Sequence, residues 1–467
     1  MIRSEETICA PATSGGGAIA VIRVSGTRSI SICDKIFFPL DIRTKLIEQK
    51  GYTIVYGEIR ANEEIIDDVL VSIFRSPHSY TGEDSVEISC HASKYIQQKI
   101  LELLIKNGAI AAQPGEFTMR AFLNGKMDLS QAEAVADLIS SESKMAHKIA
   151  ISQMRGNFSD EISILRADLL HFASLIELEL DFGEEDVEFA DRGKLKELVT
   201  KVLSVTKELT SSFSLGNAIK NGVPVAITGK TNTGKSTLLN LLLKEEKAIV
   251  SEVPGTTRDY IEDTIIIDGI QYRFIDTAGL RKTGDIVENL GIRKTLEKIE
   301  QASIVLLVAD VNEGRQALLE ILTTVRSETE GKDKKLVILV NKTDNDLNKL
   351  KAEIEGKVEL KESESLLFIS AKTGEGIEEL KKELGHLTGD SQLISESVII
   401  NNLRHYEALL KVTESLERVL SGLENKIPED LIAIDVRQAI HYLGEITGEI
   451  TTDEILGNIF KNFCIGK

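Results

Sequence analysis

The sequence predicts a three-domain protein that combines α/β and all-α parts, with an α/β domain of P-loop type inserted into a helical domain. Three observations support this prediction. An apolar run, a glycine-rich loop and a helix-like run follow one another over residues 223–243. Apolar residues recur every three or four positions on both sides of that segment, which is typical of amphipathic helices. Short β-rich runs separated by Gly, Pro and Asn occupy the N-terminal quarter.

Residues 1–124 are predicted to form an N-terminal α+β domain. Strands are expected at 18–24, 52–56, 68–74 and 85–89, and a helix at about 91–106. Residues 125–219 change to a helical period that no proline interrupts, and this period returns over 391–467. We therefore expect one helical domain in two parts, with residues 220–390 inserted at an exposed loop.

Bulk composition limits the class of protein. The chain has 467 residues, enough for two to four domains, and 42% of them are apolar. A formal net charge of −19 opposes non-specific binding of nucleic acid by the average surface. It still allows RNA contact through a local basic patch, or through a partner that carries the positive charge. No apolar run is long enough to span a bilayer and the N-terminus lacks a signal-peptide pattern, so we expect a cytoplasmic protein without a membrane partner.

The four cysteines are scattered without C-x-x-C spacing, which disfavours a zinc site or a disulfide framework. Three of them, Cys9, Cys33 and Cys90, are expected to be small buried hydrophobic residues. The fourth, Cys464, belongs to the C-terminal run Phe-Cys-Ile-Gly-Lys, where a structural cysteine is the default expectation.

The most informative motif is the loop Gly229-Lys-Thr-Asn-Thr-Gly-Lys-Ser236. It matches G-x-x-x-x-G-K-[ST] and stands between a strand-like run and a helix-like run, the context that a phosphate-binding loop requires. Backbone N–H groups of such a loop surround phosphate oxygens, and the helix N-terminus adds partial positive charge. Lys235 would reach the β- and γ-phosphates, and the Ser236 hydroxyl would bind Mg²⁺.

Four further motifs follow in the order and spacing of a Ras-like guanine-nucleotide-binding domain. Gly-Thr-Thr-Arg-Asp supplies Thr257 as a second Mg²⁺ ligand, and Asp276–Gly279 can reach the metal and the γ-phosphate. Asp344 in Asn-Lys-Thr-Asp can accept both the N1 and N2 protons of guanine, so it selects GTP over ATP. Ser370–Lys372 would support the base through backbone contacts. Each motif alone is an ordinary polar loop, but all five in order, each after an apolar run, predict a GTPase.

Further segments resemble one family along the whole chain. They are Gly17-Ala-Ile-Ala-Val-Ile-Arg-Val-Ser-Gly26, Tyr80-Thr-Gly-Glu-Asp-Ser-Val-Glu87, the run from Pro114 to Leu129, and the C-terminal Phe463-Cys-Ile-Gly-Lys467. Together with the five nucleotide motifs, they make the chain similar to the tRNA modification GTPase MnmE family, also called TrmE. The C-terminal run is the most distinctive of these signatures.

The resemblance implies an activity and its partners. With a flavin-dependent partner, MnmG (GidA), which carries the FAD, the family adds an aminomethyl or carboxymethylaminomethyl group to carbon 5 of wobble uridine 34 in certain tRNAs. A tetrahydrofolate derivative, 5-formyl or 5,10-methylene, supplies the one-carbon unit. The N-terminal domain resembles folate-binding aminomethyltransferase domains and would make the homodimer. A heterotetramer or larger complex with MnmG is expected.

The resemblance also implies a folate site. The positions that match the family's tetrahydrofolate contacts are Arg23, Glu87, Lys126 and Lys467. Cationic side chains can hold the glutamate carboxylates of folate by charge-assisted hydrogen bonds, and Glu87 can accept protons from the pterin. Which residue meets which end of the folate stays open. Cys464 matches a candidate nucleophile of the family, against the default of a structural cysteine.

The resemblance implies that hydrolysis differs from that of Ras-like enzymes in two features, the residue that orients water and the group that replaces an arginine finger. Leu280 stands where Ras-like enzymes use a glutamine to orient water, and Glu288 matches the glutamate that the family uses instead. K⁺ takes the place of an arginine finger, and the loop that holds it would be ordered when two GTPase domains meet. The implied K⁺ ligands are Asn232, Ser251, Val253 and Thr256, and the implied catalytic residues are Glu288, Lys235 and Asn232.

The full set of expected GTP contacts comes from all five motifs. It comprises Asn232, Thr233, Gly234, Lys235, Ser236, Thr237, Ser251, Glu252, Val253, Pro254, Gly255, Thr256, Thr257, Asp276, Thr277, Ala278, Gly279, Asn341, Lys342, Asp344, Ser370, Ala371 and Lys372. The phosphate loop departs from the family at one position. Thr231 stands where the family usually has proline. Threonine leaves φ free and adds a hydrogen-bond donor, so loop rigidity and nucleotide affinity are expected to differ.

Two other function classes stay open. Ribosome-assembly GTPases of the Era or EngA type share Gly-x-x-Asn-x-Gly-Lys-Ser and Asp-Thr-Ala-Gly-Leu. They carry a basic RNA-binding domain after the GTPase segment, whereas this chain has an acidic helical tail. A folate-binding transferase with GTP as a purely regulatory ligand is the third class. tRNA modification that requires both GTP and K⁺ would separate these classes from the first.

Overall fold

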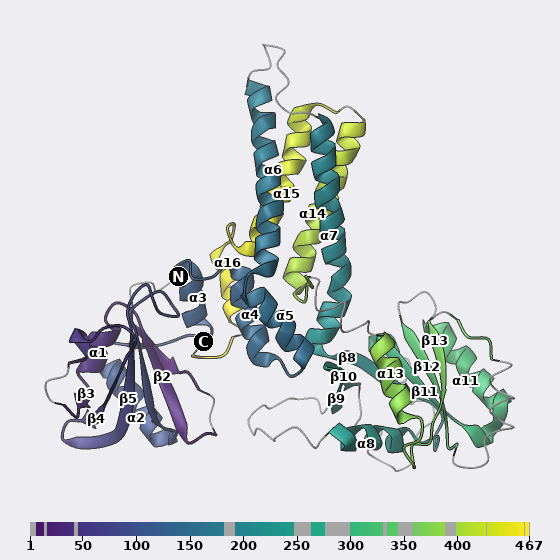
Figure 1. Ribbon diagram of the computed structural model, residues 1–467, viewed down its shortest axis with the longest axis horizontal. Helices are drawn as coiled ribbons and strands as arrows, with labels where there is room; N and C mark the ends of the chain where they lie inside the picture. The colour runs from purple at the N-terminus through teal and green to yellow at the C-terminus, as the bar shows by residue number, and fades with distance from the viewer. Residues whose placement is uncertain are drawn as a thin grey trace.

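A computed structural model of the chain describes residues 6–13, 16–41, 45–181, 192–246, 263–275, 299–329, 334–343, 358–361, 363–387, 398–425, 427–461 and 463–466. A tall helical bundle stands between two parts that contain β-sheets (Figure 1). The N-terminal α+β part lies on one side of the bundle and the α/β part lies on the other. This arrangement confirms the predicted fold class of an α/β domain inserted into a helical domain.

The N-terminal domain is built on a seven-stranded sheet of order β3-β4-β5-β6-β2-β1-β7, antiparallel except for the β1–β7 pair. The strands are β1 (Ile8–Pro11), β2 (Ile19–Ser25), β3 (Phe37–Pro39), β4 (Thr53–Ala61), β5 (Glu64–Phe74), β6 (Ser85–His91) and β7 (Ile110–Ala111). Helices α1 (Ser29–Asp34) and α2 (Lys94–Lys106) share one apolar core with the sheet, and the short η1 (Leu46–Glu48) adjoins them. The opposite face of the sheet carries alternating polar and exposed apolar residues, as a sheet covered on one side does.

The helical domain combines segments from both sides of the insertion. Its bundle consists of α6 (Asn157–Asp181), α7 (Arg192–Asn221), α14 (Leu403–Glu424) and α15 (Glu429–Thr447), whose apolar stripes form one core. At its base lie α4 (Leu129–Ser140) and α5 (Lys144–Met154) (Figure 1). Asp128 begins α4 with a capping box, because its side chain accepts from the Gln131 N–H and the Gln131 side chain returns to the Asp128 backbone. Among the described residues, no helix has the length and apolarity that crossing a membrane requires.

The α/β domain has a six-stranded sheet of order β13-β12-β11-β8-β10-β9, in which only the edge strand β9 is antiparallel. The strands are β8 (Val223–Thr228), β9 (Asp263–Ile267), β10 (Ile270–Phe274), β11 (Ile304–Asp310), β12 (Lys335–Asn341) and β13 (Glu364–Phe368). The described helices are α8 (Lys235–Glu246), η2 (Val311–Glu313), α11 (Gly314–Thr329) and α13 (Ile377–Leu387). Separate apolar cores on the two faces of the sheet explain why its central strands read as continuous apolar runs.

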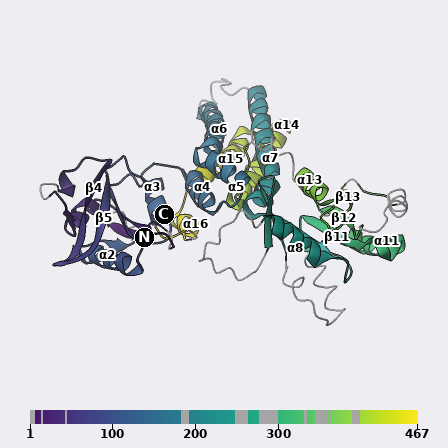
Figure 2. The same ribbon diagram turned by 60° about the horizontal axis from the view of Figure 1, so that its bottom comes forward.

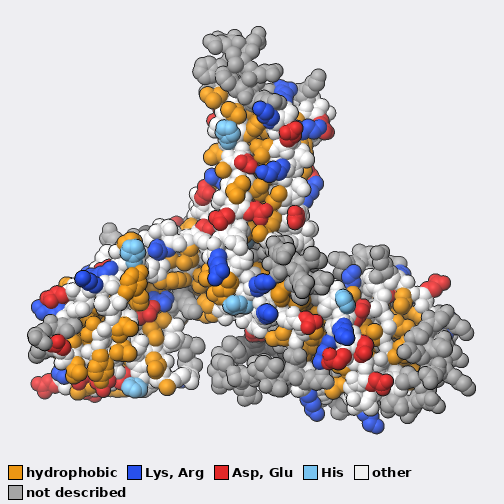
Figure 3. All heavy atoms as spheres, in the orientation of Figure 1, with side chains coloured by type: hydrophobic (Ala, Val, Ile, Leu, Met, Phe, Trp, Pro, Cys, Tyr) orange, Lys and Arg blue, Asp and Glu red, His pale blue; other side chains and the backbone are white. Residues whose placement is uncertain are grey.

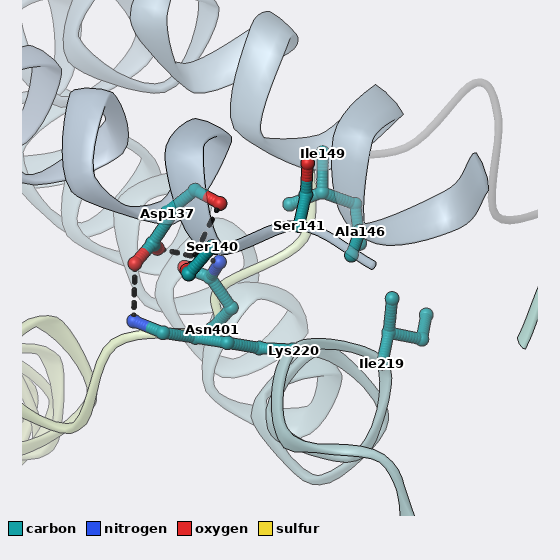
Figure 4. A pocket seen from close by; sticks show the side chains of 8 residues that line it. All are labelled: Asp137, Ser140, Ser141, Ala146, Ile149, Ile219, Lys220 and Asn401. Atoms are coloured by element: carbon teal, nitrogen blue, oxygen red, sulfur yellow. Dashed lines mark hydrogen bonds and ion pairs between the residues drawn. The ribbon is translucent and has the colours of Figure 1, made fainter. Parts of the chain in front are cut away.

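The two segments that connect the α/β domain to the helical domain lie against each other. A side chain at Gly216, near the end of α7, would overlap the carbonyl oxygen of Ile400 in the returning segment. Asp137 of α4 contacts both connecting segments. Its Oδ1 lies 2.7 Å from Lys220 Nζ, and its Oδ2 accepts a hydrogen bond from Asn401 Nδ2 at 3.0 Å. Figure 4 shows these three side chains converging on one small pocket. The insertion is therefore anchored to the base of the bundle.

The C-terminal segment returns to the N-terminal domain. Helix α16 (Asp453–Phe460) packs against α3 (Glu116–Leu123), beside the N-terminal domain (Figure 2). Gly115, which precedes α3, has φ +68°, and a Cβ there would lie 2.8 Å from the Phe460 carbonyl oxygen. Gly466 has φ +94°, and any side chain would overlap the Pro11 carbonyl oxygen. Glycine at both positions allows the tail to lie directly on the N-terminal domain.

Candidate functional site

The phosphate-binding loop joins β8 to α8 at the carboxyl edge of the sheet. Gly229 has φ +141°, and a Cβ there would overlap the Val308 carbonyl oxygen. Gly234 has φ +99°, and a Cβ there would overlap Nδ2 of Asn341. Both positions require glycine, and they bring backbone N–H groups close to the N-terminus of α8. This cradle suits a phosphate chain, so the residues present fit a nucleoside triphosphate.

The side chains of the loop occupy distinct positions. Lys235 begins α8, and its Nζ donates to the Gly229 carbonyl at 2.9 Å and to the Lys230 carbonyl. Ser236, the predicted Mg²⁺ ligand, is half-buried in the first turn of α8, and Thr237 is exposed. Asn232, the predicted K⁺ ligand, is exposed and adopts φ +63°. The ammonium group of Lys235 is therefore held against two carbonyl oxygens of the loop.

Asn341 ties the loops of the predicted guanine site together. Its Nδ2 donates to the Thr233 carbonyl at 2.7 Å, and its Oδ1 accepts from the Ala371 N–H at 2.9 Å. Ser370 is fully buried and Lys372 is exposed. The phosphate loop and the Ser-Ala-Lys loop are thus held by one amide side chain, so three of the predicted motifs meet at the same edge of the sheet.

The structure adds one residue that the sequence motifs did not indicate. Asp310 ends β11, and its Oδ2 lies 2.6 Å from Nζ of Lys342, which adopts φ +68°. Burial alone would raise the pKa of Asp310, but the hydrogen bonds from Lys342 and Asn312 outweigh it and hold that pKa below its ordinary value. The available signal was an apolar run that ends in aspartate at the edge where the other motifs end.

Many predicted nucleotide-site residues lie outside the described residues. The structure therefore does not test the second Mg²⁺ ligand, three of the four K⁺ ligands, the water-orienting glutamate or the guanine-selecting aspartate. In the part of the chain that is described, no group of three His, Cys, Asp or Glu side chains could hold a metal ion. The residues singled out from the sequence that lie outside the described part are Ser251, Glu252, Val253, Pro254, Gly255, Thr256, Thr257, Asp276, Thr277, Ala278, Gly279, Leu280, Glu288, Asp344 and Lys467.

In the N-terminal domain, two of the four predicted folate residues meet beside the C-terminal tail. Arg23 on β2 faces Glu87 on β6, and its Nε and Nη2 each lie 2.9 Å from Glu87 Oε1. Nη1 of Arg23 lies 3.4 Å from the Gly466 carbonyl, which places the tail next to the pair. The guanidinium also stacks 5.2 Å above the centre of the Tyr80 ring. The structure thus joins two predicted residues with the residue that precedes Lys467.

The other described candidates are Lys126 and Cys464. Lys126 donates to the Pro77 carbonyl at 3.0 Å, in the loop that leads to Tyr80, and has no described contact with Arg23. Cys464 is exposed in the tail, two residues before Gly466. The other three cysteines are buried, which confirms the prediction. Burial raises the pKa of the Cys9 and Cys90 thiols to about 11 and that of Cys33 further, so Cys464 is the most accessible thiol among the described residues.

Comparison with known proteins agrees with this arrangement. Residues 7–126 match the family model of the GTP-binding protein TrmE N-terminus, and residues 129–464 match that of the MnmE helical domain. The chain is 52% identical to the tRNA modification GTPase MnmE of Bacteroides thetaiotaomicron over 466 residues, which are 99% of this chain and 100% of the relative. It is 53% identical to the protein of the same name from Flavobacterium psychrophilum, over 99% of both chains.

Solved structures add little beyond these relatives. The G domain of the T. maritima FeoB iron transporter is 25% identical and covers 35% of this chain and 98% of its own, with a TM-score of 0.26 that carries no weight. The family models and the relatives instead cover the helical and N-terminal parts as well, so they disfavour the Era or EngA alternative. The chain belongs to the MnmE family of tRNA modification GTPases.

Proposed function

We propose that this chain is a K⁺-stimulated GTP hydrolase that acts with an MnmG (GidA) partner. In this proposal the pair adds an aminomethyl or carboxymethylaminomethyl group to carbon 5 of wobble uridine 34 in certain tRNAs, with a one-carbon unit from tetrahydrofolate. Family membership supplies the coarser statement, a GTPase that acts in tRNA modification. The observation that carries the finer proposal is the convergence of Arg23, Glu87 and Gly466 on one face of the N-terminal sheet.

The nucleotide half of the proposal follows from the phosphate cradle. Lys235 would transfer its hydrogen bonds from the loop carbonyls to the β- and γ-phosphates. Ser236 and Thr257 would hold Mg²⁺, which neutralises phosphate charge when it is bound. Asn232 is exposed in the loop, so its amide oxygen could serve as a ligand for K⁺. Glu288 would orient the attacking water in place of a Ras-like glutamine.

The folate half rests on charge and access. Arg23 is held by Glu87 and by the Tyr80 ring, so its guanidinium is already oriented. A folate carboxylate could share that guanidinium, and Oε2 of Glu87 has no hydrogen-bond partner among the described residues. Lys126 and Lys467 would add further positive charge nearby. The exposed Cys464 lies in the same tail, which supports its proposed proximity to the reaction.

A homodimer through the N-terminal domain agrees with an exposed apolar surface. Tyr56 and Leu70 face each other across β4 and β5 with 49% and 46% of their surfaces exposed, and Ile54 nearby is 68% exposed. Figure 3 shows apolar side chains gathered over this domain. Contiguous apolar surface of this kind marks protein contacts, and a twofold axis would bury it against its own copy.

The proposal is tested by reconstitution with an MnmG partner, GTP, a tetrahydrofolate donor and unmodified tRNA. Mass spectrometry of the wobble uridine should detect the added group when K⁺ is present and not when Na⁺ replaces it. GTP hydrolysis should fall together with modification. Unchanged hydrolysis in Na⁺ would contradict the K⁺ role, and hydrolysis without any modified uridine would contradict the folate half.

Glu288→Ala provides a separate test of the hydrolytic step. We expect the variant to bind GTP with the parent's affinity and to slow single-turnover hydrolysis by at least about tenfold, because water is no longer oriented. Asp285→Ala, which changes a neighbouring acidic residue, is the matched control and should retain the parent rate. Equal rates for Glu288→Ala and the parent would remove Glu288 from the mechanism.

A further inference from the structure

The turn that follows β11 lies between the phosphate loop and the predicted guanine site. At one end of the turn, Asp310 Oδ2 lies 2.6 Å from Lys342 Nζ. At the other end, Glu313 lies 3.5 Å from Nζ of Lys230 in the phosphate loop. None of the five nucleotide motifs includes this turn. It nevertheless lies beside the nucleotide site, because it contacts a lysine from each of two motifs.

The two ion pairs differ in burial. The Asp310 side chain is 12% exposed and that of Lys342 is 40% exposed, whereas the Glu313 and Lys230 side chains are 36% and 43% exposed. Oδ1 of Asp310 also accepts from the Asn312 N–H at 3.0 Å and from Asn312 Nδ2 at 2.8 Å. Hydrogen bonds within the turn thus orient the Asp310 carboxylate independently of its ion pair with Lys342. The Glu313 pair is a solvent-screened contact with little energy.

We propose that Asp310 is a positioning residue for guanine-nucleotide binding, acting by holding the side chain of Lys342 in place. Lys342 stands between Asn341, whose amide fastens the phosphate loop, and Asp344, which is predicted to select guanine. The backbone of Lys342 is left-handed, and its side chain is long and flexible. The ion pair with Asp310 fixes the ammonium end of that side chain. The methylene stem is then ordered before the nucleotide arrives, so binding does not have to order it.

The expected effect is on affinity and not on the hydrolytic step. Asp310 contacts Lys342 and its own turn, and it has no described contact with the phosphate loop. Losing its charge would free Lys342 in both the free and the hydrolysing enzyme. The entropy cost of ordering that lysine would then weaken GTP and GDP binding by similar factors, with kcat retained at saturation. The inference rests on GTP being the bound nucleotide, as proposed above.

The test replaces Asp310 by Asn, which keeps the shape of the side chain and an oxygen that can accept from Asn312. Titration of a fluorescent GTP analogue should show a Kd raised about five- to twentyfold, and steady-state hydrolysis should show a raised KM with kcat within about twofold. Asp310→Glu should recover part of the affinity. Glu313→Gln, on the same turn, is the matched control and should change Kd by less than about twofold.

A double-mutant cycle separates positioning from a purely structural role. Lys342→Met keeps the apolar stem and removes the ammonium group. If Asp310 acts through Lys342, the double variant Asp310→Asn/Lys342→Met should bind GTP no more weakly than Lys342→Met alone. Additive losses, or a Kd for Asp310→Asn within about twofold of the parent, would overturn the inference. Failure of the parent to bind GTP would instead overturn the proposed function.

Discussion

Replacing Glu133 by Gln should weaken the helical domain at neutral pH and have little effect in strong acid. Glu133 lies on α4 with its side chain 10% exposed, and it accepts from Arg404 Nε at 3.0 Å and Nη2 at 2.7 Å. Nε2 of the buried His405 lies 2.7 Å from the same carboxylate. Burial alone would raise the pKa of Glu133, but His405 and Arg404 outweigh it and lower that pKa to about 2. The carboxylate therefore connects the base of the domain to the start of α14.

The size of the effect follows from the displaced pKa. The pKa of an unperturbed Glu is about 4.3, and each pKa unit of displacement corresponds to about 1.4 kcal/mol of free energy. A folded-state pKa of about 2 gives at most about 3 kcal/mol at neutral pH, where burial lowers the pKa of His405 and leaves Arg404 as the charged partner. Because the pKa is depressed on folding, this stabilisation is complete above about pH 5 and is lost as the pH falls towards about 2. We expect Glu133→Gln to cost about 2–3 kcal/mol at neutral pH, or about 5–10 °C in Tm.

The assay is thermal unfolding followed by circular dichroism at about pH 7.5, 5 and 3.5, for the parent and the variant. Glu177→Gln is the matched control, because Glu177 pairs with Arg437 in the same domain with the two side chains 49% and 57% exposed. It should cost less than about 0.5 kcal/mol at every pH. The reasoning is refuted if Glu133→Gln costs no more than the control, or if its cost is the same at pH 3.5 as at pH 7.5.

Three further predictions concern the helical domain and the phosphate loop. Gly216→Ala should lower Tm by at least about 4 °C, because its Cβ would overlap the Ile400 carbonyl, whereas Gly457→Ala, with open space around it, should leave Tm unchanged or raise it. His405→Gln should reduce the loss of Tm that the parent shows between about pH 7 and 5. Burial lowers the pKa of His405, so below about pH 6.5 the unfolded chain takes up a proton that the folded chain does not, which favours unfolding. Gln cannot take up this proton. An equal slope in parent and variant would contradict this. Lys235→Ala should raise the Kd for GTP by at least about tenfold without changing Tm, measured by nucleotide titration; retained affinity would exclude Lys235 from phosphate binding.

Much of the fold could be predicted from local patterns. The strands expected at 18–24, 68–74 and 85–89 are β2, β5 and β6 of the structure, and the helix expected at about 91–106 is α2. Their apolar residues repeat with the period of the element, so the sequence shows them directly. The short strands β1, β3 and β7 were not predicted, because runs of two to four residues contain too few repeats to show a period.

The sequence by itself determined the nucleotide motifs, the two-part helical domain and the family. These features depend on residue types at fixed local spacings, such as the two glycines of the phosphate loop that leave room for Val308 and Asn341. Only the tertiary structure decided which distant residues meet. Arg23 contacts Gly466 across 443 positions, and Glu133 contacts Arg404 across 271. Contacts at such separations leave no local periodicity, because they are set by how the sheet, the bundle and the C-terminal tail pack together.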